Sequence, residues 1–355
     1  MFGRDRVPRW AYLVACLMVS LGTSLSAFWI MVNNSWMQYP TGFDLTPEGV
    51  FVPTDWSAII FNEAVWTRFP HMILAAYVTS AFCVAATGAW YVLRGKAVQE
   101  GRAMAVMGLR LAAILVPVQI GFGHLVGDFV HDRQPAKFAA IEGRWNDQQP
   151  ASEILIAWPD TKNERNLFEV SVPYLGSLIG SMSLTSKELG IRSFAPEDRP
   201  PVVIPFFAFR IMVGCGLLML ALAWVGSWLS LSERIVRARL FLIATFLSFP
   251  LGFIATLTGW FTAEVGRQPW VVYGQLRTAD AVTPFLATHE VALTFAGIAS
   301  IYALIFGFGV LYIYRLLRSG PIPAPEISLY ATNPKRPLSV PGASPGVSGT
   351  TTSGD

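Results

Sequence analysis

Long apolar stretches dominate the pattern of hydrophobic and polar positions along the chain. A helix needs about 20 consecutive apolar residues to cross the hydrocarbon core of a bilayer. Stretches of this kind occupy residues 10–32, 70–93, 103–125, 204–231, 239–262 and 290–317. The pattern therefore predicts an all-α fold, a polytopic transmembrane bundle of about six helices.

The segment between the third and fourth apolar stretches has a different composition. Residues 127–200 contain 19 of the 49 charged residues and several turn-forming pieces rich in Pro and Asp. A loop this long on a helix bundle is usually functional. We therefore predict three transmembrane helices in 1–126, a functional loop at 127–200, and three more helices in 201–320. The remaining residues, 321–355, are rich in Pro, Gly, Ser and Thr and are predicted to be a disordered tail.

Lysine and arginine collect on alternate connections between the predicted helices. The rich side holds the N-terminal residues, the connections near 94–102 and 234–239, and the end of the last helix. The loops at 33–69 and 263–289 contain only three positively charged residues, Arg68, Arg267 and Arg277. Because positive residues concentrate on the cytoplasmic side, both termini are predicted to be cytoplasmic and the 127–200 loop external, on the periplasmic side.

Composition agrees with a membrane protein and excludes other classes. Hydrophobic residues make up 53% of the chain and charged residues 14%, against about 25% charged in an ordinary soluble domain. The net charge of +3 is too small and too dispersed for binding to nucleic acid. The chain is also too apolar for general disorder.

A few residues at the ends of the apolar stretches could bind a cofactor. His71 opens the second stretch, and Arg210 and Met212 lie near the start of the fourth. An imidazole and a thioether on opposite sides of an iron make a low-spin haem suited to electron transfer. Arg210 could then pair with a haem propionate. The alternative is an interfacial histidine, a packing methionine and an arginine that reaches the membrane surface.

Glu264 and Arg267 lie three residues apart at the end of the fifth stretch. Such a spacing favours a simple ion pair on one face of a helix. A carboxylate in this position could also bind a haem iron or relay protons. The residues alone favour the ion pair.

Several sequence strings resemble subunit I of the cytochrome bd-type quinol oxidases. They are long, unusual and arranged in the order found in that family. The strings are 21–30 (LGTSLSAFWI), 34–40 (NSWMQYP), 68–71 (RFPH), 134–142 (QPAKFAAIE), 207–213 (FAFRIMV) and 259–270 (GWFTAEVGRQPW).

The resemblance implies roles for particular residues. His71 and Met212 would be the axial ligands of a low-spin haem b, with Arg210 at a propionate. Glu264 would bind a high-spin haem b, with Trp260 and Arg267 packed beside the haems. The loop 127–200 would oxidise quinol, with Lys187 and Glu188 orienting it and accepting its protons.

The resemblance also implies a reaction, partners and a location. Family members oxidise ubiquinol or menaquinol and reduce O2 to water in the bacterial cytoplasmic membrane. They work with a second subunit, sometimes with small single-span subunits, and carry a third haem, d or b. In the family three further helices precede the region that this sequence matches. We therefore expect the site of the third haem to be incomplete in these 355 residues, and O2 reduction to need the additional helices.

Three hypotheses follow from the sequence. The first is a haem-binding subunit I of a cytochrome bd-type quinol oxidase. The second is a degenerate haem b membrane protein without oxidase activity. The third sets the resemblance aside and takes the chain as a six-span transporter with an external binding loop, which would bind no haem.

Overall fold

The structure is a computed structural model that describes residues 7–320, apart from 233 and 284–285. Six helical segments are long and apolar enough to cross a membrane, which confirms the predicted bundle. They are α1 (Arg9–Gln38), α3 (Glu63–Leu93), α4 (Val98–Arg133), α7 (Val203–Ser230), the pair α9 (Arg239–Leu247) and α10 (Leu251–Val265), and α11 (Thr288–Ser319). The predicted disordered tail, 321–355, lies outside the described residues.

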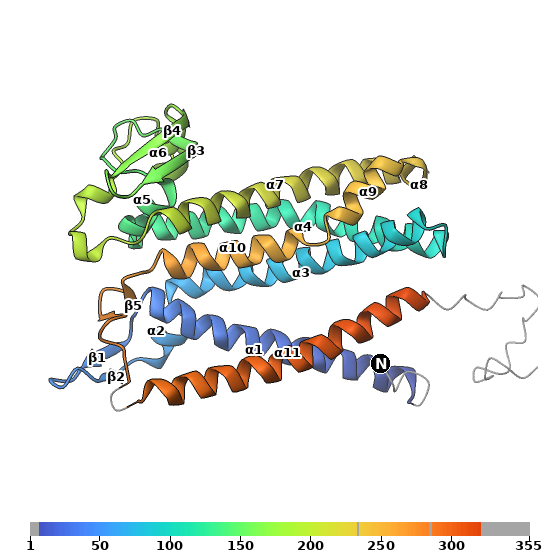
Figure 1. Ribbon diagram of the computed structural model, residues 1–355, viewed down its shortest axis with the longest axis horizontal. Coiled ribbons are helices and arrows are strands. Elements are labelled where there is room, and N and C mark those ends of the chain that lie inside the picture. Colours follow the sequence, from blue (N-terminus) through green and yellow to red (C-terminus); the bar gives the residue numbers. More distant parts are fainter. Residues whose placement is uncertain (1–6, 233, 284–285, 321–355) are drawn as a thin grey trace, which may run out of the picture.

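Four helices form the centre of the bundle (Figure 1). The principal contacts run from α3 to α4, from α4 to α7, from α7 to α10, and from α10 back to α3. This closed ring places α3 and α7 at opposite corners. We call the end of the bundle where α3 and α7 begin the loop end.

Small residues allow α3 and α4 to approach closely. A Cβ atom on Gly88 of α3 would lie 2.4 Å from the carbonyl oxygen of Gly101 and 2.5 Å from the backbone nitrogen of Ala105. A Cβ atom on Gly108 would lie 2.4 Å from the carbonyl oxygen of Ala81. Because lipid is as apolar as the helix surfaces, close packing through small residues is what holds such helices together.

Several helices differ from their predicted bounds, among them α1, which continues to Gln38, and α3, which begins at Glu63. The predicted helix 239–262 is divided into α9 and α10 at Pro250, which has no N–H to donate and so interrupts the hydrogen-bond ladder. The predicted helix 103–125 continues to Arg133 as part of α4. Its last turns are polar, so hydropathy alone does not detect them, and the helix ends just before Pro135.

Helices α1 and α11 lie outside the four-helix ring (Figure 1). All four buried residues of α1 lie in its second half, from Met31 to Gln38. None of the residues of α11 is buried. Near its end, however, the carbonyl of Leu317 accepts a hydrogen bond of 2.7 Å from the Tyr91 hydroxyl of α3.

The remaining elements gather mostly at the loop end. They include short antiparallel hairpins in addition to helices. In chain order they are β1 (Phe43–Leu45), β2 (Phe51–Pro53), α2 (Trp56–Ile60), α5 (Pro135–Glu142), β3 (Glu153–Asp160), β4 (Arg165–Val172), α6 (Leu175–Ser181), two 3-10 turns (Ile191–Ser193 and Pro196–Asp198), α8 (Arg234–Arg237), β5 (Trp270–Val272) and β6 (Leu276–Arg277).

The segment between α4 and α7, here called loop 134–202, has a hydrophobic core of its own. Helix α5 begins at Pro135, a favourable first helical position, and ends before Gly143 in the left-handed conformation. Its alanines pack with the loop and with the start of α7. The buried residues of this core are Ala139, Ala140, Trp145, Ile154, Ala157, Ile191, Val202 and Phe206. The loop is therefore a folded unit seated on the bundle.

Replacing Gly88 or Gly108 by Val is expected to separate α3 from α4. The added side chains have no space, so each change should destabilise the protein by about 1–3 kcal/mol, the usual cost of overpacking. Gly121→Val in α4 is the matched control, because nothing lies within 4 Å of a Cβ atom there. Thermal unfolding of the purified protein should show a lower Tm than the wild type for Gly88→Val and Gly108→Val, and an unchanged Tm for Gly121→Val. Equal Tm values in all three would contradict this account of the α3–α4 contact.

Candidate functional site

His71 and Met212 lie at similar depth on opposite corners of the ring. His71 is eight residues into α3, which begins at Glu63, and Met212 is nine residues into α7, which begins at Val203. At 1.5 Å per residue, these positions are about 12 Å and about 14 Å from the helix starts. The fold thus brings the two predicted iron ligands to the same level of the bundle.

The ring of His71 has one nitrogen with a partner and one without. Its Nε2 accepts a hydrogen bond of 3.3 Å from the amide nitrogen of Gln119 in α4. Its Nδ1 is buried and has no hydrogen-bond partner among the described residues. On the same face of α4, a Cβ atom on Gly123 would lie 3.2 Å from the ring carbon Cε1. A buried nitrogen without a partner is unusual enough to need an explanation.

Met212 faces a glycine as well. A Cβ atom on Gly259 of α10 would lie only 2.8 Å from the Met212 sulfur. Both predicted iron ligands therefore lie against helix faces that carry no side chain at that point.

Glu264 is held by hydrogen bonds from two sides at the end of α10. Its Oε2 accepts a bond of 2.6 Å from Arg267, so the ion pair predicted from their spacing is present. Its Oε1 accepts a bond of 2.9 Å from the Asn34 amide of α1. The Asn34 oxygen in turn accepts a bond of 2.6 Å from Arg68 of α3. One side chain of α1 therefore joins an arginine and a carboxylate from two other helices.

Buried positive charge exceeds buried negative charge around Glu264. Three basic side chains are buried there, those of Arg68, Arg267 and Lys137 of α5. The only carboxylate near them among the described residues is that of Glu264. The Lys137 ammonium donates a bond of 3.0 Å to Gln38. Burial, together with the charge of Arg68, lowers the pKa of Lys137 well below its usual range. The Nε and Nη1 atoms of Arg267 have no partner among the described residues.

Arg210 points toward loop 134–202. Its guanidinium donates to the carbonyls of Ile141 at 2.8 Å and Phe206 at 3.1 Å. It also donates to the carbonyls of Ile154 and Leu155. These bonds fasten α5 and β3 to α7. The propionate contact predicted from the sequence is not among them and stays a prediction.

Two glutamates, the buried Glu142 and the partly buried Glu153, lie near Arg210 at the base of the loop. Glu153 is 3.9 Å from the Arg210 guanidinium. Burial, followed by the neighbouring Glu142, raises the pKa of Glu153 to about 9. The Oε2 atom of Glu142 is buried without a hydrogen-bond donor among the described residues. Glu153 therefore keeps its proton beside Glu142, with which it shares a side-chain hydrogen bond.

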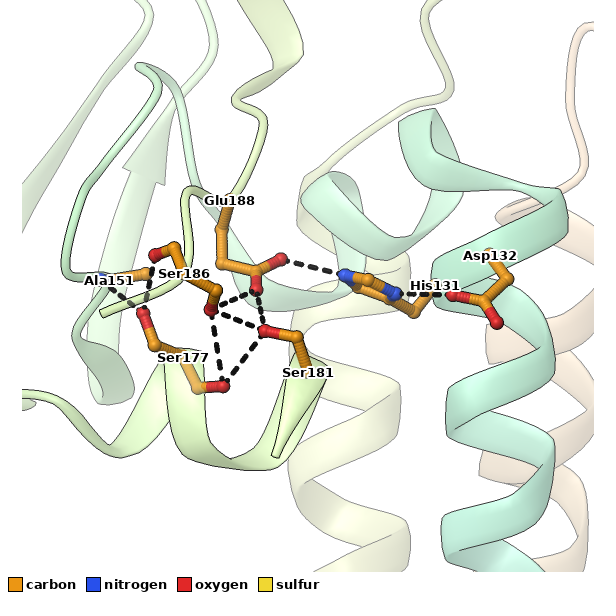
Figure 2. Close-up of polar contacts among 7 residues, drawn as sticks. All are labelled: His131, Asp132, Ala151, Ser177, Ser181, Ser186 and Glu188. Atoms are coloured by element: carbon orange, nitrogen blue, oxygen red, sulfur yellow. Dashed lines mark hydrogen bonds and ion pairs between the residues drawn. The ribbon is translucent and has the colours of Figure 1, made fainter. Parts of the chain in front are cut away.

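The other predicted residues occupy different surroundings. Lys187 is half-exposed and forms an ion pair of 2.7 Å with Asp147. The adjacent Glu188 is buried and bonds to His131 and two serines (Figure 2). The Trp260 indole is 46% exposed, so the described residues leave nearly half of its surface uncovered.

Sequence reasoning missed several residues of this region. Arg68, Lys137 and Glu142 lie within strings that were noted for their resemblance but were given no role. A useful signal was present for Lys137 and Glu142, because both interrupt an otherwise apolar short helix, PAKFAAIE. Asn34 gave no comparable signal, since its role depends on contacts with α3 and α10.

Comparisons with known proteins agree with this arrangement. The family model described as cytochrome bd terminal oxidase subunit I matches residues 1–321. The chain is 33% identical to cytochrome bd ubiquinol oxidase subunit 1 of Bacillus subtilis (strain 168), over 90% of this chain and 70% of that protein. It is 29% identical to cytochrome bd-II ubiquinol oxidase subunit 1 of Escherichia coli (strain K12), over 90% and 75%. The bd oxidase structure from Geobacillus thermodenitrificans superposes with a TM-score of 0.79 at 28% identity, covering 89% of this chain and 72% of that one.

The protonated Glu153 predicts a pH dependence for the docking of loop 134–202. An unfolded glutamate has a pKa of about 4.3, whereas folding raises the pKa of Glu153 to about 9. Between these values the folded protein holds a proton that the unfolded protein has lost. The free energy of unfolding of the loop therefore falls as the pH rises through this range.

Glu153→Gln keeps the size and neutrality of the protonated side chain and should remove this dependence. The measurement is the rate of protease cleavage within the loop at pH 6 and pH 9. Glu169→Gln, on the exposed part of β4, is the matched control and should behave like the wild type. A pH dependence that is the same in Glu153→Gln and the wild type would contradict the protonated state of Glu153.

Proposed function

Because the chain belongs to the cytochrome bd terminal oxidase subunit I family, we propose that it binds haem and oxidises quinol in a bacterial membrane. One observation carries this proposal, namely the placement of His71 and Met212 at one level on opposite corners of the four-helix ring. The named relatives from Bacillus subtilis and Escherichia coli are ubiquinol oxidase subunits, and we propose a quinol, ubiquinol or menaquinol, as the substrate here.

The residues at the ring fit a haem held between α3 and α7. The unpartnered Nδ1 of His71 and the glycines that face both ligands support this fit. A neutral imidazole and a thioether are the ligand pair of low-spin electron-transfer haems. When bound, this haem b would accept electrons singly from quinol and pass them onward. With Nδ1 left for the iron, Nε2 would carry the ring proton and, with the Gln119 amide turned, donate it to the amide oxygen, which is buried without a partner among the described residues.

Glu264 is proposed as the ligand of a second, high-spin haem b. Its hydrogen bonds from Arg267 and Asn34 fix the direction in which the carboxylate points. The ion pair with Arg267 is therefore compatible with ligation and does not by itself exclude it.

The excess positive charge around Glu264 is proposed to be balanced by haem propionates. Arg68, Arg267 and Lys137 are buried against a single carboxylate, and buried charges need partners of opposite sign. The Nε and Nη1 atoms of Arg267, which have no hydrogen-bond partner among the described residues, support this assignment. Arg210, whose donors are taken up by loop carbonyls, would act mainly as the anchor of the loop.

Loop 134–202 is proposed to bind and oxidise quinol on the external side of the membrane. Oxidation of quinol releases two electrons and two protons, so proton acceptors must lie near water. Glu142, Glu153 and Glu188 are the candidates, each part of a cluster of polar side chains. Lys187 would orient the quinol headgroup from its half-exposed position. Trp260 is proposed to contact a haem or a neighbouring subunit with its exposed face.

The complete reaction needs partners beyond the residues described. We propose that a second oxidase subunit accompanies this one, with small single-span subunits as further candidates. Reduction of O2 to water, at a third haem of d or b type, is proposed for the assembled oxidase. Both termini are proposed to be cytoplasmic, as the distribution of Lys and Arg predicts.

Haem spectra distinguish the three hypotheses. The purified complex is treated first with a reduced quinol without oxygen and then with dithionite. An oxidase subunit should show reduced haem bands with quinol. A degenerate haem protein should show them with dithionite alone, and a transporter should show none.

His71→Ala or Met212→Ala should each remove the reduced low-spin bands, because each change deletes an axial ligand. His289→Ala, at the exposed start of α11, is the control and should leave them in place. A low-spin spectrum that persists in Met212→Ala would disprove that assignment.

Glu264→Gln is expected to change the bands of the high-spin haem while leaving the low-spin bands intact. An amide keeps the shape of the side chain but binds ferric iron far less well than a carboxylate. The control is Glu63→Gln, which breaks an exposed ion pair of 2.9 Å with Arg133 at the same end of the bundle. A Glu264→Gln variant with lower thermal stability and an unchanged spectrum would mean that the residue serves only the ion pair.

A further inference from the structure

His131 connects a buried carboxylate with an exposed one at the end of α4 (Figure 2). Its Nε2 lies 2.9 Å from Oε2 of Glu188 in loop 134–202. Its Nδ1 lies 2.8 Å from Oδ1 of Asp132, the next residue of the helix. Both ring nitrogens are therefore occupied by carboxylate oxygens.

This arrangement requires a mobile proton. Ionised carboxylates only accept hydrogen bonds, and a neutral imidazole has one N–H to donate. Satisfying both contacts takes one proton more, carried either by the ring or by one of the two carboxyls. Glu188, His131 and Asp132 thus share a proton that can occupy more than one site.

The three side chains lie on a path from the protein interior to water. The exposed fraction of the side chain is 2% for Glu188, 24% for His131 and 70% for Asp132. Imidazole transfers protons efficiently along such a path because it can accept at one nitrogen and release from the other.

The buried end of the path is held in place by its surroundings. Oε1 of Glu188 accepts hydrogen bonds from Ser181 at 2.8 Å and Ser186 at 3.1 Å (Figure 2). A Cβ atom on Gly180 would lie 3.2 Å from the same oxygen, so the glycine leaves room for the carboxylate. The backbone of Glu188 pairs with Gln148 in both directions, at 2.9 Å and 3.0 Å.

The ring of His131 is held as well. Its centre lies 5.0 Å from that of the Phe138 ring of α5, which stands edge-on to it. The charged groups that face the ring are Asp132 from its own helix and Glu188 from the loop. Lys187 forms an ion pair with Asp147 at 2.7 Å, and the hydroxyls near Glu188 come from Ser181 at the end of α6 and from Ser186 after it.

We propose that Glu188, His131 and Asp132 form the route by which protons released from quinol leave loop 134–202 for the external water. The inference rests on the proposed quinol oxidation and adds the proton exit to it. Quinol gives up two electrons to the haem and two protons to the loop. A proton on the Glu188 carboxyl moves to Nε2 of His131, and the proton on Nδ1 leaves to Asp132 and then to water. A turn of the imidazole that exchanges the places of its two nitrogens restores the starting tautomer, so that one proton moves outward in each cycle.

His131 acts through Glu188 and is a positioning and relay residue, so its test needs a readout that a purely structural contact would not change. The purified oxidase complex is mixed with reduced quinol without oxygen, and the rate of haem reduction is followed from pH 5.5 to pH 9. The variants are His131→Gln and His131→Ala, with His289→Gln as the matched control on the exposed start of α11.

The wild-type rate should rise with pH as the His131 imidazole becomes able to accept a proton, at a pH above its ordinary range because, despite burial, Asp132 and Glu188 raise its pKa. His131→Gln should lower the rate by about tenfold or more at neutral pH and should lose this rise. Added imidazole should restore part of the rate in His131→Ala. Reduction by dithionite should be unchanged in every variant, and His289→Gln should match the wild type.

Two results would overturn the relay alone. One is a His131→Gln variant with the rate and pH profile of the wild type. The other is a slower variant that keeps the wild-type pH profile and does not respond to imidazole, which would make the contact a structural tie. A wild-type complex that dithionite reduces and quinol does not would instead contradict the proposed function, and the relay with it.

Discussion

Charge buried at the loop end of the bundle needs partners, and this requirement joins segments that are distant in the sequence. Asn34 of α1 accepts from Arg68 of α3 and donates to Glu264 of α10. Gln38 of α1 accepts from Lys137 of α5 and donates to the carbonyl of Ala263. In a buried site these hydrogen bonds take the place of the bonds that the same groups would make to water at the protein surface. The outer helix α1 is thereby tied to the ring at the level where the proposed haem ligands lie.

The position of loop 134–202 depends on the same need for partners. Arg210 is partly buried near the start of α7, and backbone carbonyls of α5 and β3 accept hydrogen bonds from its guanidinium. The loop therefore depends on the bundle for its position, and the bundle depends on the loop for the partners of this cation. This dependence explains why a segment of turns, short helices and a hairpin has a core that continues into Phe206 of α7. It also keeps the proposed quinol site close to the haem ligands.

Hydropathy and the resemblance to known strings predicted much of the candidate site. The residues His71, Met212 and Glu264 were singled out before any geometry was known, and the ion pair of Glu264 with Arg267 is present. The direction of Arg210, the burial of Lys137 and the bridging role of Asn34 were not predicted. His131 falls in the predicted loop 127–200, yet it lies within α4 and contacts Glu188 across 57 positions of the chain. These features depend on long-range contacts, which leave no periodic pattern in the sequence.

The sequence by itself determined the class of fold and the family. Apolar stretches long enough to cross a bilayer allow little except helices, because every backbone polar group in lipid must be satisfied within its own segment. The tertiary structure alone decided which helices are neighbours and where each polar side chain points. Six similar apolar stretches can be arranged in many ways, and the contacts of Gly88, Gly108 and Gly252 select one of them through close approach of the backbones. The partner of a buried charge is then set by which helices meet at its level, a relation that exists only in the folded protein.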